Sequence, residues 1–178
     1  MSRYIAFLRA INVGGHNVKM SQLIQLFESL GLKNVESFIA SGNLVFDAKA
    51  GNVKTLEKKI ETKLHEALGY EVATFIRTNA ELDEISKHKP FPQVQLDTAT
   101  ALNIAFIANP IDDQAKQKLM ALQNEIDAFH VHGREIYWMC QKKQSESKFS
   151  NAILEKAIGA KATLRSINTV RKMAEKYT

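Results

Sequence analysis

The sequence predicts an α+β fold: two ferredoxin-like halves packed into one compact unit, followed by an extra C-terminal helix. Strand-like and helix-like patterns follow one another in the order β-α-β-β-α-β, and this order occurs twice along the chain. Hydrophobic residues make up 45% and charged residues 24% of the 178 residues, which is ordinary globular usage and excludes a disordered or coiled-coil chain. A chain of this length can build a hydrophobic core without disulfide bonds.

The first half is assigned to residues 1–78. Its strands are expected at residues 3–11, 35–40, 44–46 and 72–77, and its helices at residues 20–30 and 53–68. The first strand is apolar on both alternating sides, which is typical of a strand covered on both faces. Each helix has an apolar stripe with helical spacing, and the helices end at Gly31 and Gly69. Ser41-Gly42-Asn43 is expected to form the turn of a hairpin.

Residues 79–100 are expected to connect the halves through a helical segment and Pro90-Phe91-Pro92. The second half, residues 101–178, repeats the element order. Its strands are expected at residues 101–108, 129–131, 135–140 and 162–164, and its helices at residues 115–126, 151–158 and 167–177. Ser147 or Ser150 is expected to cap the second of these helices, and Asn168 or Thr169 the last. We find the same order of elements in both halves without convincing residue-level identity. Two helices cover one face of such a sheet, so the second face is expected to meet the other half or a partner chain.

Composition limits the classes of protein further. The single cysteine, Cys140, excludes an intrachain disulfide and any site built from several thiolates; we expect a buried, inert thiol. No apolar run approaches the ~20 residues of a membrane span, and the first residues resemble a strand rather than a signal peptide. We therefore expect a soluble, cytoplasmic protein with no membrane partner. Residues 140–178 carry nine Lys/Arg and three Asp/Glu, which suits a polyanion, but a solvated face is the favoured explanation.

Two loops form the first candidate site. In this topology the first strand ends at the sheet edge where the hairpin turns, so the loop after the first strand and the hairpin turn are expected to lie close together. Glycines before a helix leave backbone N–H groups accessible to an anion. The candidate ligand-binding residues are Arg9, Asn12, Gly14, Gly15, Asn17, Lys19, Ser41, Gly42 and Asn43. Tight turns and helix caps explain the same residues equally well, and pairing with a carboxylate is the favoured explanation of Arg9.

Other chemistry is less evident. His130 and His132 lie two residues apart on a strand, a spacing that metal sites use, but no third ligand with useful spacing follows, so no metal ion is expected. The sequence has no Walker loop, no Gly-x-Gly-x-x-Gly and no Gly-x-Ser-x-Gly. We therefore expect no cofactor and assign no reaction. Arg165, Asn168 and Thr169 form a second polar cluster before the last helix, which capping explains.

Several segments carry a resemblance to a known family. They are Leu-Arg-Ala-Ile-Asn-Val-Gly-Gly at 8–15, Lys-Met at 19–20, Ser-Gly-Asn-Leu-Val-Phe at 41–46, Pro-Phe at 90–91, Ser-Lys at 147–148 and Asn-Thr-Val at 168–170. With these segments the chain resembles the bacterial family catalogued as domain of unknown function 1697. The resemblance implies an α+β fold of two ferredoxin-like halves and no established activity, substrate or cofactor. Near the end the family tends to have Thr-x-Arg-Asn-Trp-Asn-Thr-Val, and this chain departs from it at Ser166 and Ile167.

Three functions are compatible with these features. The first is binding of a small phosphorylated or carboxylated ligand at the glycine-bearing loops. The second is weak nucleic-acid binding without sequence specificity, and poor interleaving of aromatic and basic residues argues against it. The third is interaction of a sheet edge or the basic tail with another protein. The sequence predicts neither the ligand nor the oligomeric state.

Overall fold

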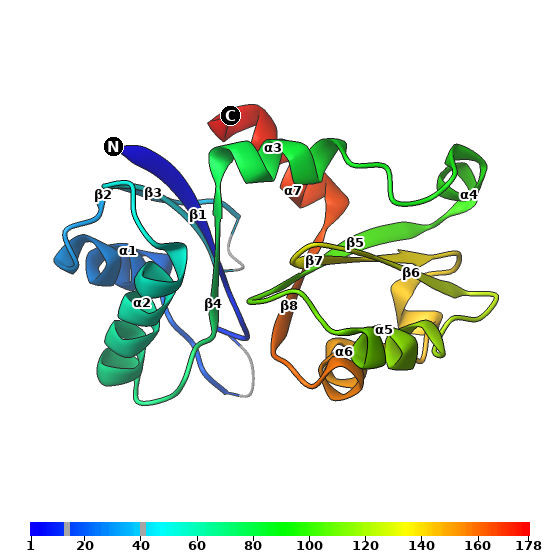
Figure 1. Ribbon diagram of the computed structural model, residues 1–178. Coiled ribbons are helices and arrows are strands. Elements are labelled where there is room, and N and C mark those ends of the chain that lie inside the picture. The colour runs from blue at the N-terminus through cyan, green and yellow to red at the C-terminus, as the bar shows by residue number, and fades with distance from the viewer. Residues whose placement is uncertain (13–14, 40–41) are drawn as a thin grey trace. The chain divides into compact units, whose positions relative to one another are not determined.

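The structure is a computed structural model that describes residues 1–12, 15–39 and 42–178. The chain divides into two units, one comprising Met1–Glu84 and Met173–Thr178 and the other Ile85–Lys172. Each unit contains a four-stranded antiparallel sheet with helices (Figure 1). The fold is therefore the predicted α+β duplication of two ferredoxin-like halves with an additional C-terminal helix.

The first unit contains a sheet of strand order β2-β3-β1-β4, and α1 and α2 cover one of its faces (Figure 1). Its elements are β1 (Ser2–Leu8), α1 (Met20–Ser29), β2 (Lys33–Ser37), β3 (Asn43–Ala48), α2 (Val53–Leu68) and β4 (Thr74–Thr78). Asn52 caps α2, because its side-chain oxygen accepts a hydrogen bond from the Lys54 N–H at 2.8 Å. Ile60 and Leu64 carry the apolar stripe of α2 into the core, and Gly69 ends the helix with a φ of 82°.

The second unit has the equivalent strand order β6-β7-β5-β8, with α5 and α6 on one face of the sheet (Figure 1). Its sheet and covering helices are β5 (Ala101–Ile107), α5 (Asp113–Met120), β6 (Asp127–His132), β7 (Glu135–Cys140), α6 (Asn151–Ile158) and β8 (Ala162–Ser166), with a short 3-10 helix at Gln144–Glu146. The remaining helices are α3 (Asn79–Lys87), α4 (Gln93–Thr98) and α7 (Ile167–Tyr177). Ser150 caps α6 as predicted, accepting a hydrogen bond from the Ile153 N–H at 3.3 Å.

The internal duplication extends to strand register, with a short identical segment at equivalent places in the two sheets. Residues 5–7 and residues 104–106 both read Ile-Ala-Phe and lie at equivalent places in β1 and β5. Ile5 lies opposite Arg77 across β1 and β4, and Ile104 lies opposite Arg165 across β5 and β8. The two sheets can therefore be compared at these equivalent positions and at the helices that follow β4 and β8.

Both sheets are buried on both faces, as the apolar alternation of the first strand predicts. On the side opposite α1 and α2, the side chains of Ile5, Phe7, Val45 and Phe75 are at most 2% exposed. On the corresponding side of the second sheet, Ile104, Phe106 and Tyr137 are fully buried. The thiol of Cys140 is buried too, and burial raises its pKa, which agrees with the expected inert side chain.

Glutamate side chains from the helices accept hydrogen bonds from backbone N–H groups of the outer strands β4 and β8. The backbone N–H groups of Thr74 and Ile76 in β4 donate to Glu61 and Glu57 of α2, at 3.2 and 3.3 Å. In the second unit the Ala162 N–H of β8 donates to Glu155 of α6 at 2.8 Å. Unpaired strand edges are templates for pairing with another chain, so these bonds reduce the capacity of β4 and β8 for such pairing.

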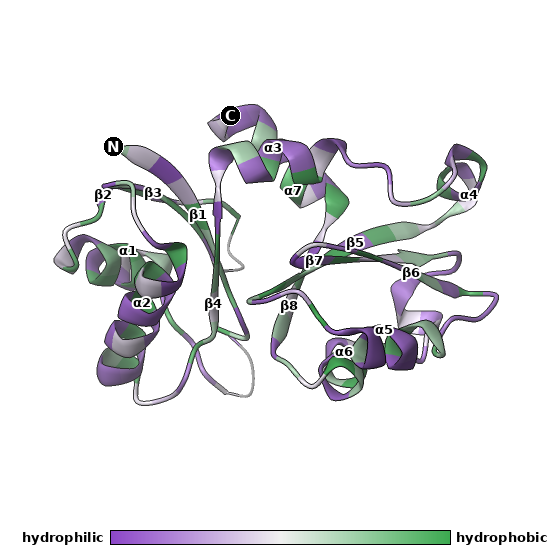
Figure 2. Cartoon of the chain, in the orientation of Figure 1, coloured by the Kyte–Doolittle hydropathy of each residue, from purple (hydrophilic) through white to green (hydrophobic). Residues whose placement is uncertain are grey.

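Hydropathy follows this architecture. In Figure 2 the inner parts of the strands are mostly hydrophobic, whereas α2 carries many hydrophilic residues along its length. Among the helices of the described residues, none combines the length and the apolar content needed to cross a membrane.

Candidate functional site

The end of the predicted first strand, at Leu8 and Ile11, lies close to Gly42 of the predicted hairpin turn. The Leu8 N–H at the end of β1 donates to the Gly42 carbonyl at 2.9 Å. Gly42 has a φ of 75°, and a Cβ at this position would lie 2.9 Å from Cγ2 of Ile11, so both conformation and space require glycine. Gly14 and Ser41 lie outside the described residues.

Most other residues of this predicted site have a structural role or lie exposed. The Asn12 side chain accepts a hydrogen bond from the Val18 N–H at 2.8 Å, and the fully buried Asn43 side chain donates to the Phe38 carbonyl at 3.1 Å. Both bonds close loops. Gly15, Asn17 and Lys19 are exposed, and Arg9 is half-buried just beyond β1. Anion binding at these loops therefore stays a prediction.

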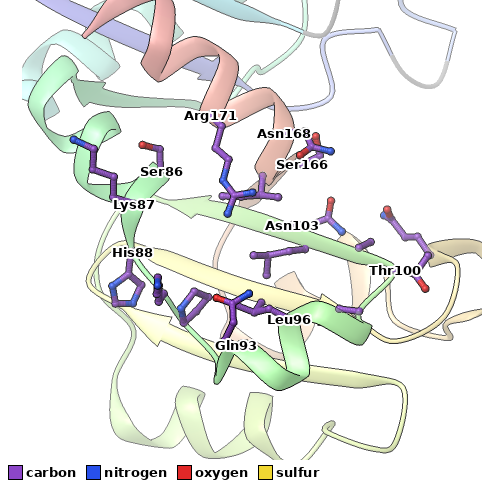
Figure 3. A pocket seen from close by; sticks show the side chains of 17 residues that line it. Ser86, Lys87, His88, Gln93, Leu96, Thr100, Asn103, Ser166, Asn168 and Arg171 are labelled. Atoms are coloured by element: carbon purple, nitrogen blue, oxygen red, sulfur yellow. The ribbon is translucent and has the colours of Figure 1, made fainter.

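A cavity lies in the second unit, between the start of α7, the first residues of β5 and the segment that follows α3. It has a volume of about 620 Å³, which is within the usual range for small-molecule sites. Its polar lining includes Lys87, His88, Lys89, Asn103, Ser166, Asn168 and Arg171, and its apolar lining includes Pro90, Leu96, Leu102 and Ile167. Figure 3 shows Arg171 extending from α7 toward β5, with Asn103 to one side in this view and Lys87 to the other.

The charge of this cavity is one-sided. Three positively charged side chains line it, those of Lys87, Lys89 and Arg171, and no Asp or Glu is found among its described lining residues. Their positive charge favours an anion, and the apolar part of the lining favours a ligand with a carbon skeleton.

Asn103 is the most informative lining residue. Its side chain is 6% exposed, and in the described part of the chain its Nδ2 has no hydrogen-bond partner. Leaving a buried donor unsatisfied costs about 1–3 kcal/mol. A ligand oxygen in the cavity would supply the missing acceptor.

The start of α7 adds backbone donors to the same cavity. Ser166 caps this helix, since its Oγ accepts a hydrogen bond from the Thr169 N–H at 3.2 Å; this corrects the prediction of Asn168 or Thr169 as the cap. No acidic residue lies in the first turn of α7. The first N–H groups of a helix have no partner within the helix, and Ser166 bonds to that of Thr169. The other N–H groups of this turn, together with the helix dipole, favour a negative charge.

The equivalent helix start in the first unit shows a different arrangement. Helix α3 follows β4 as α7 follows β8, and it begins with a complete capping box. The Thr78 Oγ1 accepts from the Glu81 N–H at 3.1 Å, and Glu81 accepts from the Thr78 N–H at 2.8 Å. Thr169 occupies the position in α7 that Glu81 occupies in α3. A carboxylate therefore caps the start of α3, and the start of α7 at the cavity has none.

Three histidines meet at the edge of this cavity. His88 Nε2 lies 3.2 Å from His130 Nε2, and the rings of His88 and His132 stack with centroids 4.1 Å apart. Burial is the main cause that lowers the pKa of His88 and of His130, so both imidazoles are neutral at pH 7. The sequence offers no third ligand with useful spacing after His130 and His132, but the structure brings His88, 42 residues before His130, close to both rings.

The fold and these geometries define an α+β protein with a basic cavity in its second half. The chain belongs to the family described as protein of unknown function DUF1697, whose model matches residues 1–137. Its fold is similar to that of the conserved bacterial protein SP0830 from Streptococcus pneumoniae, with a TM-score of 0.77 and 23% identity over 98% of this chain and 97% of that one. No curated protein shows significant similarity to the chain. Ser166 and Ile167, before and at the start of α7, both line the cavity.

Sequence reasoning missed most of the cavity because its residues come from separated segments. Ser166 and Asn168 belong to the polar cluster before the last helix, which the sequence does show. Asn103 within an apolar strand was the one further signal, because a buried amide requires a partner.

Proposed function

We propose that the protein binds a small organic anion, phosphorylated or carboxylated, in the cavity at the start of α7. The observation that carries the proposal is the buried Asn103 Nδ2, which has no partner among the described residues and lines a cavity with a basic lining. An anionic oxygen accepts from this donor and from the first N–H groups of α7. Arg171 adds a planar guanidinium, which can bind a phosphate or carboxylate through two hydrogen bonds.

The size and the mixed lining indicate the class of ligand. A cavity of 620 Å³ accommodates more than an inorganic ion, and its apolar residues suit an uncharged carbon portion beside the anionic group. The proposal keeps the ligand class predicted from the sequence and places it at a different site from the glycine-bearing loops.

Calorimetry with the full chain tests this proposal. Pyrophosphate and citrate are titrated into wild type, Arg171→Gln and Lys19→Gln at fixed ionic strength. We expect wild type and Lys19→Gln to bind one of these anions equally, and Arg171→Gln to bind at least about tenfold more weakly, because a charged hydrogen bond is lost. Equal binding by Arg171→Gln, or a loss confined to Lys19→Gln, would contradict the proposed location.

A further inference from the structure

We infer that His88, His130 and His132 form a binding site for a divalent transition-metal ion such as Zn²⁺. Their ring nitrogens all lie within 4.8 Å of one another. Imidazole nitrogen is a common protein ligand for this class of metal, and three histidines with an open fourth position form a known type of zinc site. This inference goes beyond the proposed anion binding and does not depend on it.

The distances suit coordination of one ion. Zinc–nitrogen bonds of about 2.0–2.1 Å in a tetrahedron place neighbouring ligand nitrogens about 3.3 Å apart. The His88 and His130 Nε2 atoms are 3.2 Å apart, so these two already span one edge of such a tetrahedron. His132 is exposed, and its side chain can adjust to bring the third nitrogen to the same ion.

The fold holds these side chains on one side of the second sheet. His130 and His132 are two residues apart on β6 and therefore project from the same face. Tyr137 lies opposite His130 in register, its ring is 5.2 Å from that of His88, and its hydroxyl donates to the Ile85 carbonyl at 3.2 Å. This bond anchors the end of α3, three residues before His88, against β7.

The charge around the three histidines sets the nature of the fourth ligand. His88 also lines the basic cavity, whose described lining offers no carboxylate. Burial is the main cause of the lowered pKa of His130, and Lys116 adds a nearby positive charge. A metal ion held by three neutral imidazoles would bring two further positive charges, so water, hydroxide or an external anion completes the coordination.

Cobalt titration of the untagged full chain tests the site. Co²⁺ is added to wild type in chelator-free buffer without phosphate or carboxylate, the visible absorption is followed, and Zn²⁺ is then added to displace the cobalt. We expect one Co²⁺ per chain, a spectrum of low coordination number and displacement by Zn²⁺. His132→Gln, at an exposed position that tolerates substitution, should weaken binding at least about tenfold, because it removes a direct ligand.

Two variants provide matched controls. His65→Gln removes an exposed histidine of α2 and should bind Co²⁺ like wild type, which distinguishes the cluster from scattered surface histidines. Arg171→Gln should also retain metal binding, so failure of the anion proposal leaves this inference intact. Absence of a cobalt spectrum in folded wild type, or equal weakening by His65→Gln and His132→Gln, would overturn it.

Discussion

Asn103 lies directly opposite Ser166 across the β5–β8 pair, and both side chains line the cavity. Ser166 uses its hydroxyl to cap α7, whereas Asn103 keeps a buried amide N–H group without a partner among the described residues. A protein selected only for stability would place an apolar side chain at such a position. Under the proposed function, the donors at this pair serve a bound anion.

Replacing Asn103 with leucine should separate stability from binding. We expect Asn103→Leu to stabilise the fold by about 1 kcal/mol, because the unsatisfied donor is removed with little change in volume, and to weaken anion binding. Urea unfolding and calorimetry measure the two effects. The matched control is Asn43→Leu, whose buried amide donates to the Phe38 carbonyl and whose loss should destabilise by about 1–3 kcal/mol. Destabilisation by both variants alike would refute the assignment of Asn103.

A carboxylate at position 169 should fill the role that Glu81 has in the first unit. Thr169→Glu is expected to raise the free energy of unfolding by about 0.5–1 kcal/mol, because the carboxylate completes the cap of α7. It should also weaken anion binding, because the carboxylate repels the anion. Thr169→Gln can complete the same capping box without charge, so it should retain most of the binding. If glutamate and glutamine at this position leave anion affinity equally unchanged, the start of α7 does not contribute to the site.

The Arg3–Asp47 ion pair should make stability depend on pH. Hydrogen bonds from Arg3, the closer at 2.9 Å, lower the pKa of Asp47 below its usual value, so the folded state favours the charged carboxylate. This contribution is fully present above the unfolded-state pKa of about 3.9 and is lost as the pH falls through the lower folded-state value. Urea unfolding from pH 7 down to pH 3 should show the stability advantage of wild type over Asp47→Asn shrinking below about pH 4. A constant difference across this range would contradict the linkage.

Two glycines near the predicted loops should respond differently to alanine. At Gly15, with a φ of 85° and open space around its Cα, alanine should cost about 1 kcal/mol from backbone strain. At Gly42 the new Cβ would also lie 2.9 Å from Ile11, and this overpacking should add about 1–3 kcal/mol. Chemical denaturation of both variants measures the difference. Equal costs would show that the close approach of Gly42 to Ile11 has no energetic consequence.

The fold was accessible from the sequence because its signals are local. The alternating residues of β1, the stripe of α2 and the glycine at the end of that helix each predict one element. The extent of the duplication was harder to see, because equivalence of Arg77 and Arg165 is defined by strand pairing rather than by sequence similarity. The sequence predicts helix α7 but points to Asn168 or Thr169 as its cap, two or three residues after Ser166, because Ser166 also ends β8.

The site was less accessible because it depends on contacts between distant segments. His88 follows α3, while His130 and His132 lie on β6, and no spacing rule connects them. Likewise, Asn103 and Arg171 approach the same cavity from a strand and a helix 68 residues apart. The glycine-bearing loops were predicted as a site because their residues are polar and close in sequence. Of these residues, Asn12 and Asn43 have a structural reason for being there, since their side chains form hydrogen bonds within the fold.

The most direct measurement is NMR mapping of pyrophosphate or citrate on the full, isotope-labelled chain. We expect saturable shifts of the Asn103 side-chain amide and of the backbone N–H groups of Ile167 and Asn168, with residues 15–19 unaffected. Saturable shifts confined to residues 15–19 and 42–43, with Asn103 unchanged, would contradict it.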